Sequence, residues 1–150
     1  MGKSRLEYHN KVKFLGIIFD RRLTFVDYVT YIVDRCKPRL NVLRAISGSE
    51  WGASKETLLM VYRALIRSVL EYGCVAFDSA PKTAKAKLDL VQSKALAICT
   101  GAMRGTAVNS LQIDCGEMPL SLRRRQITLE YTAKIRAIPD HPTQSILEES

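Results

Sequence analysis

The sequence predicts a mainly α-helical protein, with a short N-terminal β-hairpin stub followed by a bundle of four to five helices. β-forming residues concentrate in residues 11–20, whereas from Thr24 onward apolar residues recur at steps of three and four. The chain has 150 residues and a hydrophobic fraction of 47%. That is enough for one domain with its own core, and it excludes disordered, collagen-like and low-complexity proteins.

The N-terminal stub is expected in residues 11–20. Val12, Phe14 and the run 17–19 favour strands, and Gly16 interrupts them with a bend or bulge. Two isolated strands are marginal in water, so the stub needs a helix layer or a missing sheet to pack on. We divide the chain into a β-stub over residues 1–22, a helical bundle over residues 23–138 and a flexible tail over residues 139–150.

The first helix is expected to begin at Thr24 and to end near Ile46. Thr24 is predicted as its N-cap, with Asp27 at the third helical position. Pro38 lies inside the apolar pattern and should kink the helix or split it in two, because proline has no N–H and clashes with the preceding turn.

The remaining helices have recognisable ends. Ser54 is predicted to cap the second helix, and Gly73 follows that helix as a C′ glycine. Trp51, in the loop before it, is expected to lie as a lid on one end of the bundle. Three more helices are expected, over about Thr83–Thr100, Asn109–Cys115 and Pro119–Ala137.

The last of these helices carries apolar residues on two sides. One stripe contains Leu120, Ile127 and Ile135, and a second contains Leu122 and Leu129. A helix of this kind is usually packed between other elements, so we expect both stripes to be covered.

The charge of the chain indicates a polyanionic partner. The chain has 23 Lys+Arg against 15 Asp+Glu, a formal net charge of +8. Three of the acids, Asp140, Glu148 and Glu149, follow the last basic residue, so residues 1–137 carry 23 basic against 12 acidic side chains, or +11. Basic side chains displace condensed counterions from phosphate backbones. On charge alone, a soluble surface with surplus lysine is an equal alternative.

Other classes of protein are not supported by the sequence. The four cysteines, Cys36, Cys74, Cys99 and Cys115, lack the paired spacing of a zinc site and are expected as buried, reduced thiols. Residues 2–13 are polar and basic, unlike a signal peptide, and no apolar run approaches the roughly 20 residues that span a bilayer. We therefore expect an intracellular protein, in the nucleus or the cytoplasm, with no membrane partner.

Motifs that would indicate catalysis are also missing from the sequence. It contains no glycine-rich phosphate loop, no Gly-x-Ser-x-Gly, no His-Glu-x-x-His and no Asp-Asp pair to hold two metal ions. Asp27 and Asp34 could share a helix face, but Arg35 and Lys37 nearby favour a solvated surface. We predict no catalytic residue, no metal ligand and no small-molecule substrate.

Basic clusters are the stronger indication of function. Arg63 and Arg67 are spaced i,i+4 and project together. The other clusters are Arg35, Lys37, Arg39 and Arg44; Lys82, Lys85, Lys87 and Lys94; and Arg123, Arg124 and Arg125.

Three consecutive arginines fan over about 200° of a helix, so we expect at least one of Arg123–Arg125 to pair with a carboxylate or a helix end. Arg124 is weighed equally as a bridge between helices, whereas Arg123 and Arg125 are expected to be freer for phosphates. The segment from Tyr72 to Phe77 could stack a base, but core packing is the more common role.

Taken in order, several segments resemble non-LTR (LINE-type) retrotransposon reverse transcriptases of the jockey- and I-like branch. They are Lys13-Phe14-Leu15-Gly16-Ile17 with Asp20, Leu23 and Phe25; Leu40–Arg44; Trp51-Gly52-Ala53; the run from Leu59 to Gly73; Leu88–Leu96; Thr100-Gly101-Ala102; and Pro119-Leu120 with Arg123-Arg124. The resemblance covers residues 11–142 and falls in the end of the palm and the thumb or connection region of that family.

This resemblance implies a nucleic-acid-binding fragment of an RNA-directed DNA polymerase. Phe14, Leu15 and Gly16 would contact the primer terminus. The candidate backbone contacts of a template–primer duplex are Arg63, Arg67, Lys85, Lys87, Lys94, Arg123 and Arg125. The family's catalytic aspartates have no counterpart in this chain, so we expect it to be inactive alone, with no cofactor and with magnesium belonging to the palm. The remaining polymerase domains are a further expected partner.

The sequence leaves two other functional hypotheses open. The exposed β-stub and the two-sided last helix could form an α-helical protein–protein interaction module derived from such an element. An independent enzyme is the weaker alternative, because the paired carboxylates are missing.

Overall fold

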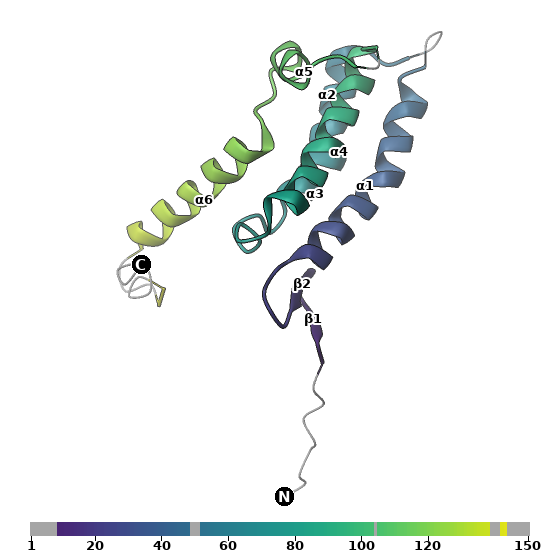
Figure 1. Cartoon of the computed structure of the whole chain (residues 1–150). Helices are drawn as coiled ribbons and strands as arrows, with labels where there is room; N and C mark the ends of the chain where they lie inside the picture. The colour runs from purple at the N-terminus through teal and green to yellow at the C-terminus, as the bar shows by residue number, and fades with distance from the viewer. Residues whose placement is uncertain (1–8, 49–51, 104, 139–141, 144–150) are drawn as a thin grey trace, which may run out of the picture.

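The computed structural model describes residues 9–48, 52–103, 105–138 and 142–143, and confirms the predicted mainly α-helical fold with an N-terminal β-hairpin (Figure 1). Its elements are β1 (Lys11–Phe14), β2 (Ile17–Asp20), α1 (Val26–Ile46), α2 (Lys55–Tyr62), the π-helical turn η1 (Arg63–Arg67), α3 (Ser68–Glu71), α4 (Lys82–Thr100), α5 (Val108–Cys115) and α6 (Leu120–Ala137). Trp51 and most of the expected tail lie outside the described residues.

Helix α4 forms the centre of the bundle and contacts α1, α2, α5 and α6. The core between these helices is built from apolar residues at helical spacing, and the largest fully buried side chains include Tyr28, Tyr62, Phe77, Leu43 and Leu88. The four cysteines are unpaired and buried in this core, as expected. Burial raises the pKa of the Cys36 thiol to about 11 and that of Cys99 to about 12, so both stay protonated at neutral pH.

The hairpin is antiparallel, and Phe14 pairs with Ile17 across a two-residue turn. Leu15 and Gly16 form this turn with φ values of 47° and 82°. Positive φ at both positions is the requirement of a type I′ turn, whose twist matches that of the strands. The side chains of β1 face solvent, whereas Ile17, Ile18 and Phe19 of β2 pack on the helical core, so the stub uses the helices as its second layer.

The start of α1 differs from the prediction. Phe25, not Thr24, occupies the N-cap position, and its own side chain makes no capping bond. The carboxylate of Asp20 takes that role, because it accepts hydrogen bonds from the backbone N–H of Thr24 and of Phe25, at 3.1 and 2.8 Å, and from the Thr24 hydroxyl. Burial disfavours the charged form of this group, but these bonds outweigh it and lower the pKa of Asp20.

Helix α1 continues through Pro38 to Ile46, so of the two effects expected of this proline, a kink or a split, the split does not occur. The predicted second helix corresponds to α2, η1 and α3 in succession, because the backbone stays helical at both junctions. Ser54 accepts a bond from the Thr57 N–H, which confirms the predicted cap. The π-helical turn at residues 63–67 was not predicted, because one wide turn barely disturbs a three-and-four-residue pattern.

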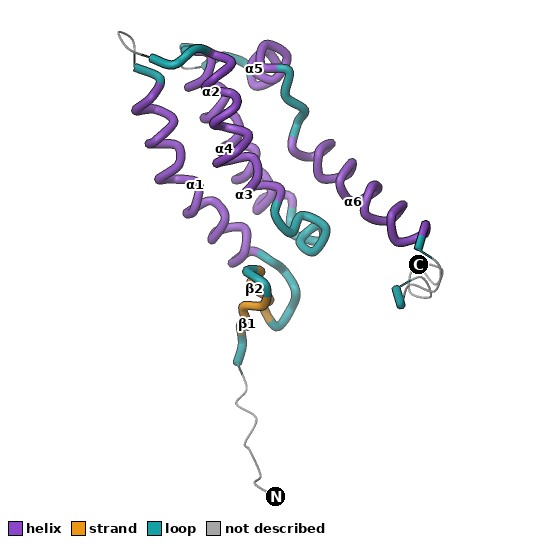
Figure 2. The backbone as a smooth tube through the Cα atoms, turned by 180° about the vertical axis from the view of Figure 1, so that it is seen from behind, coloured by secondary structure: helices purple, strands orange, loops and turns teal. Residues whose placement is uncertain are grey.

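Helices α5 and α6 begin and end within one residue of the predicted positions. Helix α6 diverges from the other helices after its first turns (Figures 1 and 2). Leu122 and Leu129 are 53% and 61% exposed, so the expectation that both apolar stripes are covered is wrong. The sequence pattern indicates which residues are apolar, but the neighbour that would cover the second stripe is not among the described elements.

Gly73 follows α3 and packs closely against the hairpin. Replacing Gly73 with a larger residue therefore tests this contact. The residue has a φ of 69°, and a Cβ there would lie 2.9 Å from Ile17 Cδ1 and 3.1 Å from the Tyr28 hydroxyl. We predict that Gly73→Ala lowers the free energy of unfolding by about 3 kcal/mol, because it combines backbone strain with overpacking. Urea denaturation measures this loss.

The matched control is Gly101→Ala. Gly101 has a similar φ of 64°, but no described residue lies within 4 Å of the added Cβ. This variant should lose only the backbone part, about 1 kcal/mol. Equal losses for the two variants would contradict the close packing of the hairpin on α3.

Candidate nucleic-acid interface

The predicted arginine pair on the second helix is held by a buried carboxylate. Glu117, between α5 and α6, has a side chain that is only 2% exposed. Its Oε1 accepts a bond from Arg63 Nε at 2.6 Å, and its Oε2 accepts one from Arg67 Nη1 at 3.0 Å. Burying a carboxylate costs free energy unless the group is paired and hydrogen-bonded. Glu117 can therefore be buried because Arg63 and Arg67, on one continuous helix, both bond to it.

A second carboxylate extends this arrangement to α6. Glu71 Oε1 lies 2.9 Å from Arg67 Nε and 2.9 Å from Arg123 Nε. The hydrogen bond to Glu71 raises the pKa of Arg123. We call the five alternating side chains the Arg–Glu network. Its members are Arg63, Glu117, Arg67, Glu71 and Arg123.

A neutral polar cluster lies beside the network. Gln92 is 1% exposed and donates to the hydroxyl of Tyr62 at 3.3 Å and to the carbonyl of Met118 at 3.1 Å. The side-chain oxygen of Gln92 in turn accepts a bond from Gln112 at 3.2 Å. Burial raises the pKa of Tyr62, so its hydroxyl stays protonated. The cluster joins α2, α4 and α5 to Met118, and so fixes the α5–α6 connection that carries Glu117.

These contacts change how the basic residues can be used. Arg63, Arg67 and Arg123, all predicted phosphate contacts, already bond to carboxylates. The side chain of Arg123 is 27% exposed and that of Arg124 only 5%, but Arg123 is held by Glu71 and is less free for a phosphate than expected. The expectation that at least one of the three consecutive arginines pairs internally is confirmed. Arg124 is 5% exposed, and its Nη2 lies 3.7 Å from Asp89 Oδ1.

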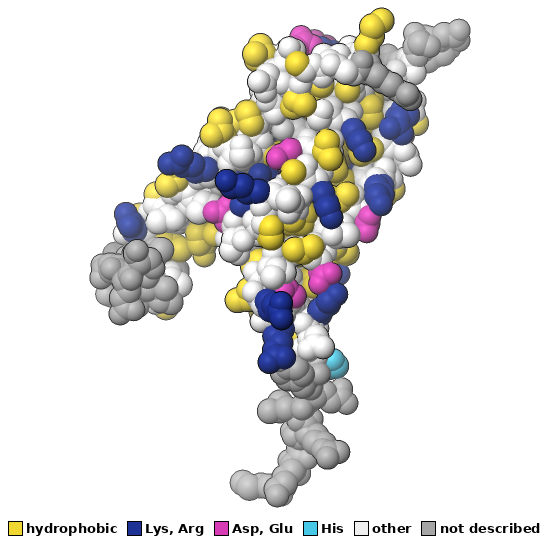
Figure 3. Space-filling model, in the orientation of Figure 1, with side chains coloured by type: hydrophobic (Ala, Val, Ile, Leu, Met, Phe, Trp, Pro, Cys, Tyr) yellow, Lys and Arg dark blue, Asp and Glu magenta, His cyan; other side chains and the backbone are white. Residues whose placement is uncertain are grey.

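Three of the other four predicted phosphate contacts are free among the described residues. Lys87 and Lys94, seven residues apart on α4, and Arg125 on α6 are exposed and have no partner within the described part of the chain. Lys85 donates to the carbonyl of Asp78 at 2.6 Å. Figure 3 shows basic side chains over several elements of one face, interspersed with apolar ones.

The basic group on α1 is partly neutralised. Lys37 lies 2.7 Å from Asp34, and Arg44 donates to the side chain of Asn41. The guanidinium of Arg35 lies over the ring of Tyr31, 5.7 Å from its centroid. This group is therefore less available to phosphates than the free lysines of α4.

The hairpin tip projects from the bundle, as contact with a nucleic-acid end requires. The side chains of Phe14 and Leu15 are 63% and 73% exposed. The tip is nevertheless fixed in place, because the hydroxyl of Tyr72 donates to the Leu15 carbonyl at 2.6 Å and the hydroxyl of Tyr28 donates to the Tyr72 carbonyl at 2.9 Å.

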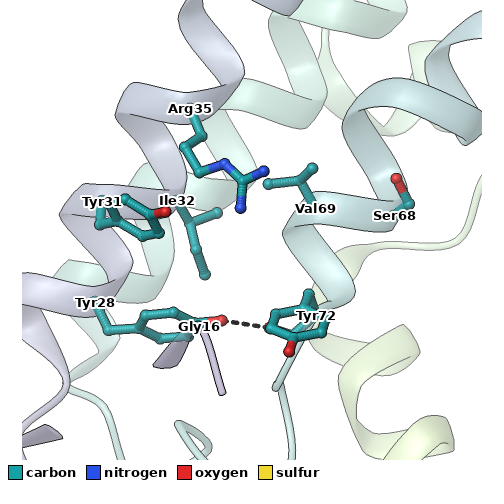
Figure 4. Close-up of a pocket in the computed structure, with 8 residues that line it drawn as sticks. All are labelled: Gly16, Tyr28, Tyr31, Ile32, Arg35, Ser68, Val69 and Tyr72. Carbon is teal, nitrogen blue, oxygen red and sulfur yellow. Dashed lines mark hydrogen bonds between the residues drawn. The ribbon is translucent and has the colours of Figure 1, made fainter. Parts of the chain in front are cut away.

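A pocket of about 260 Å³ lies behind the tip, between α1 and α3 (Figure 4). Gly16, Tyr28, Tyr31 and Tyr72 line it, and Arg35 reaches across it from α1 toward α3. Lys13 donates to the hydroxyl of Tyr31 at 3.1 Å, and this bond lowers the pKa of Tyr31. The hairpin therefore exposes apolar side chains at its tip, while polar hydrogen bonds attach it to the helices behind the tip.

The residues that the structure describes contain neither a candidate metal site nor a candidate membrane-spanning helix. No three His, Cys, Asp or Glu side chains in them gather into a group that could hold a metal ion. No helix among the same residues is both long and apolar enough to cross a bilayer.

The chain was compared with known proteins. It is 22% identical over 121 residues to the Retrovirus-related Pol polyprotein from type-1 retrotransposable element R1 of Nasonia vitripennis. It is 21% identical over 137 residues, 91% of its length, to the RNA-directed DNA polymerase from mobile element jockey of Drosophila funebris. Several of its curated relatives are RNA-directed DNA polymerases of non-LTR retrotransposons. This finding confirms the resemblance seen in the sequence.

A third relative, the probable RNA-directed DNA polymerase from transposon X-element of Drosophila melanogaster, is 28% identical over 92 residues, 61% of this chain. The chain spans between 10% and 36% of the length of these curated retrotransposon relatives. No family profile matches the chain, and no solved structure matches it significantly.

The Arg–Glu network should stabilise the fold through Glu117. We predict that Glu117→Gln lowers the free energy of unfolding by about 2 kcal/mol, because it leaves Arg63 and Arg67 without their shared negative charge. Urea denaturation at neutral pH measures the loss. The control is Asp34→Asn, which removes an exposed pair with Lys37 and should change stability by less than about 0.5 kcal/mol. Similar values for both variants would argue that the network is not structural.

Proposed function

We propose that this chain is the thumb or connection segment of a retrotransposon RNA-directed DNA polymerase, and that it binds the template–primer duplex. The similarity to the jockey polymerase over 91% of the chain, but only 15% of that protein, carries the proposal. A segment of this kind would be one part of a larger polymerase.

The free lysines of α4 support nucleic-acid binding. Lys87 and Lys94 lie about 10 Å apart along the helix axis, since each residue adds about 1.5 Å. Exposed Leu90 lies between them, and neither ammonium group is neutralised by a described carboxylate. Contacts from such groups to phosphates are independent of sequence and sensitive to salt. Arg125 would extend this surface onto α6, and Lys85 would join it at the start of α4.

The hairpin supports contact with the primer end. Phe14 and Leu15 are exposed on a turn that Tyr72 holds in place, and Gly16 allows the backbone to approach a ligand closely. The arginines of the Arg–Glu network have a mainly structural role in this proposal. Arg63, 48% exposed despite its bond to Glu117, is the member best placed for a phosphate contact as well.

We propose that the chain is not catalytic alone. Its sequence has no Asp-Asp pair, so the carboxylates that bind magnesium would belong to a palm outside this chain. The intracellular location expected from the sequence stays a prediction.

A second candidate function is protein interaction within the polymerase. Val12 and Phe14 on β1, and Leu122, Leu129 and Tyr131 on α6, are each at least half exposed. Large exposed apolar side chains on an edge strand and on a diverging helix are typical of surfaces that meet another protein. The remaining polymerase domains are the partner that this candidate function implies.

The lysines of α4 can be tested by salt dependence. We predict that Lys87→Ala/Lys94→Ala weakens binding to a primer–template duplex and lowers the slope of log K against log salt by about 2, because each lysine contacts one phosphate. Fluorescence anisotropy over a salt series measures the slope. The control, Lys37→Ala/Lys55→Ala, makes the same charge change at lysines already paired with Asp34 and Asp114 and should leave the slope unchanged. No binding by the unaltered chain at low salt would contradict the proposed function.

The hairpin tip can be tested by varying the nucleic-acid end. We predict that Phe14→Ala weakens binding to a recessed primer–template about fivefold, through lost contact with the terminal base. Binding to the same duplex closed by loops at both ends should not change. Val12→Ala, also on β1 and 52% exposed, is the control and should affect neither ligand. An equal loss on both duplexes would mean that Phe14 does not contact the primer end.

A further inference from the structure

A second pocket, of about 290 Å³, lies where the starts of α4 and α6 meet. Its lining consists of Asp78, Lys82, Lys85, Asp89, Ser121 and Arg124. Lys82 is the first residue of α4 and Ser121 the second residue of α6, and neither helix has a side-chain N-cap, because prolines occupy both N-cap positions. The first N–H groups of both helices therefore have no partner within their own helix. Two positive helix ends and three basic side chains favour an anion here.

Two buried atoms of residues that line this pocket have no hydrogen-bond partner in the part of the chain that the structure describes. Nη1 of Arg124 is one, although the residue is only 5% exposed, and Oδ1 of Asp89 is the other. Nη2 of the same arginine lies 3.7 Å from this oxygen, which is too long for a hydrogen bond. Buried polar atoms are nearly always hydrogen-bonded, so an unpaired donor beside an unpaired acceptor calls for a group that both accepts and donates.

The pocket offers further donors around these two atoms. The ammonium of Lys82 and the hydroxyl of Ser121 have no partner among the described residues, and both are exposed at its mouth. Lys85 is held by Asp78, which neutralises part of its charge. The lining has three cationic side chains and two carboxylates, so their charges sum to +1. The two helix N-termini add further partial positive charge.

We propose that this pocket binds a phosphate group that carries, or adjoins, a hydroxyl. Phosphate oxygens accept from Arg124 Nη1, Lys82 and Ser121, and the hydroxyl donates to Asp89 Oδ1. Two sources share this chemistry, free hydrogen phosphate with its own P–OH and a ribonucleotide backbone with its 2′-hydroxyl. Sulfate has the same shape but carries no proton at neutral pH, so Asp89 repels it without a compensating bond. The proposal does not require that the chain bind a duplex.

The test is a titration of the full chain with inorganic phosphate and with sodium sulfate, at pH 7 and constant ionic strength. Backbone NMR signals of Ser121 and Leu122 and the Arg124 Nε–H signal report binding. We expect saturable shifts with phosphate and about tenfold weaker binding of sulfate, since one hydrogen bond to a charged group separates the two ligands. No saturable shift with phosphate, or equal affinities, would overturn the proposal.

Variants at the pocket mouth avoid the buried arginine, whose replacement could unfold the chain. Lys82→Ala should weaken phosphate binding at least about threefold, whereas Lys134→Ala, an exposed lysine of α6 outside the pocket, should not change it. Asp89→Asn should abolish the preference for phosphate over sulfate, because an amide can donate to either ion. A preference that survives in Asp89→Asn would also overturn the proposal.

Short RNA and DNA strands distinguish the two sources. Shifts of the same signals with RNA but not DNA would identify a ribose phosphate. Shifts with inorganic phosphate alone would identify a free phosphate or a phosphate monoester. A failure of duplex binding would contradict the proposed function and leave the phosphate titration standing, so the two proposals fail separately.

Discussion

The buried carboxylate of Glu117 is the constraint on which the rest of the structure depends. A charge that is 2% exposed must be compensated, and Arg63 and Arg67 compensate it from a helix that is distant in sequence. Glu71 then bridges Arg67 to Arg123, so one series of alternating charges fixes the α5–α6 connection and the first turns of α6 against the bundle. Beyond those turns α6 diverges, and its second apolar stripe stays exposed.

This constraint separates the basic residues into two groups. Arginines, whose planar forks suit carboxylates, hold the helices together, whereas Lys87 and Lys94 have no partner among the described residues. The net charge of +8 therefore overstates the number of groups available to a polyanion. At the hairpin, Phe14 and Leu15 are exposed while the hydroxyl of Tyr72 bonds to the Leu15 carbonyl, so the exposed apolar side chains stand on a fixed backbone.

Local sequence patterns predict the helices and strands. They do not predict which side chains pair with partners far away in the sequence. Ser54, Gly73 and Pro119 act on adjacent backbone, and their predicted places at helix ends agree with the structure. The Asp20 cap was missed because it acts from five residues before the helix, on the far side of a turn. Glu117 was missed because nothing in a lone glutamate between helices indicates burial. The partner of Arg63 and Arg67 is Glu117, 54 and 50 residues away, and the partner of Arg123 is Glu71, 52 residues away, so sequence spacing could not assign their roles.

We propose that the free lysines on α4, and not the arginines of the Arg–Glu network, form the main phosphate-binding surface. Lysine acetylation followed by mass spectrometry, with and without a primer–template duplex, tests it across all lysines at once. We predict that the duplex protects Lys87 and Lys94 while Lys37 and Lys55, paired with Asp34 and Asp114, keep their reactivity. Equal reactivity of Lys87 and Lys94 in the free and bound chain would contradict it.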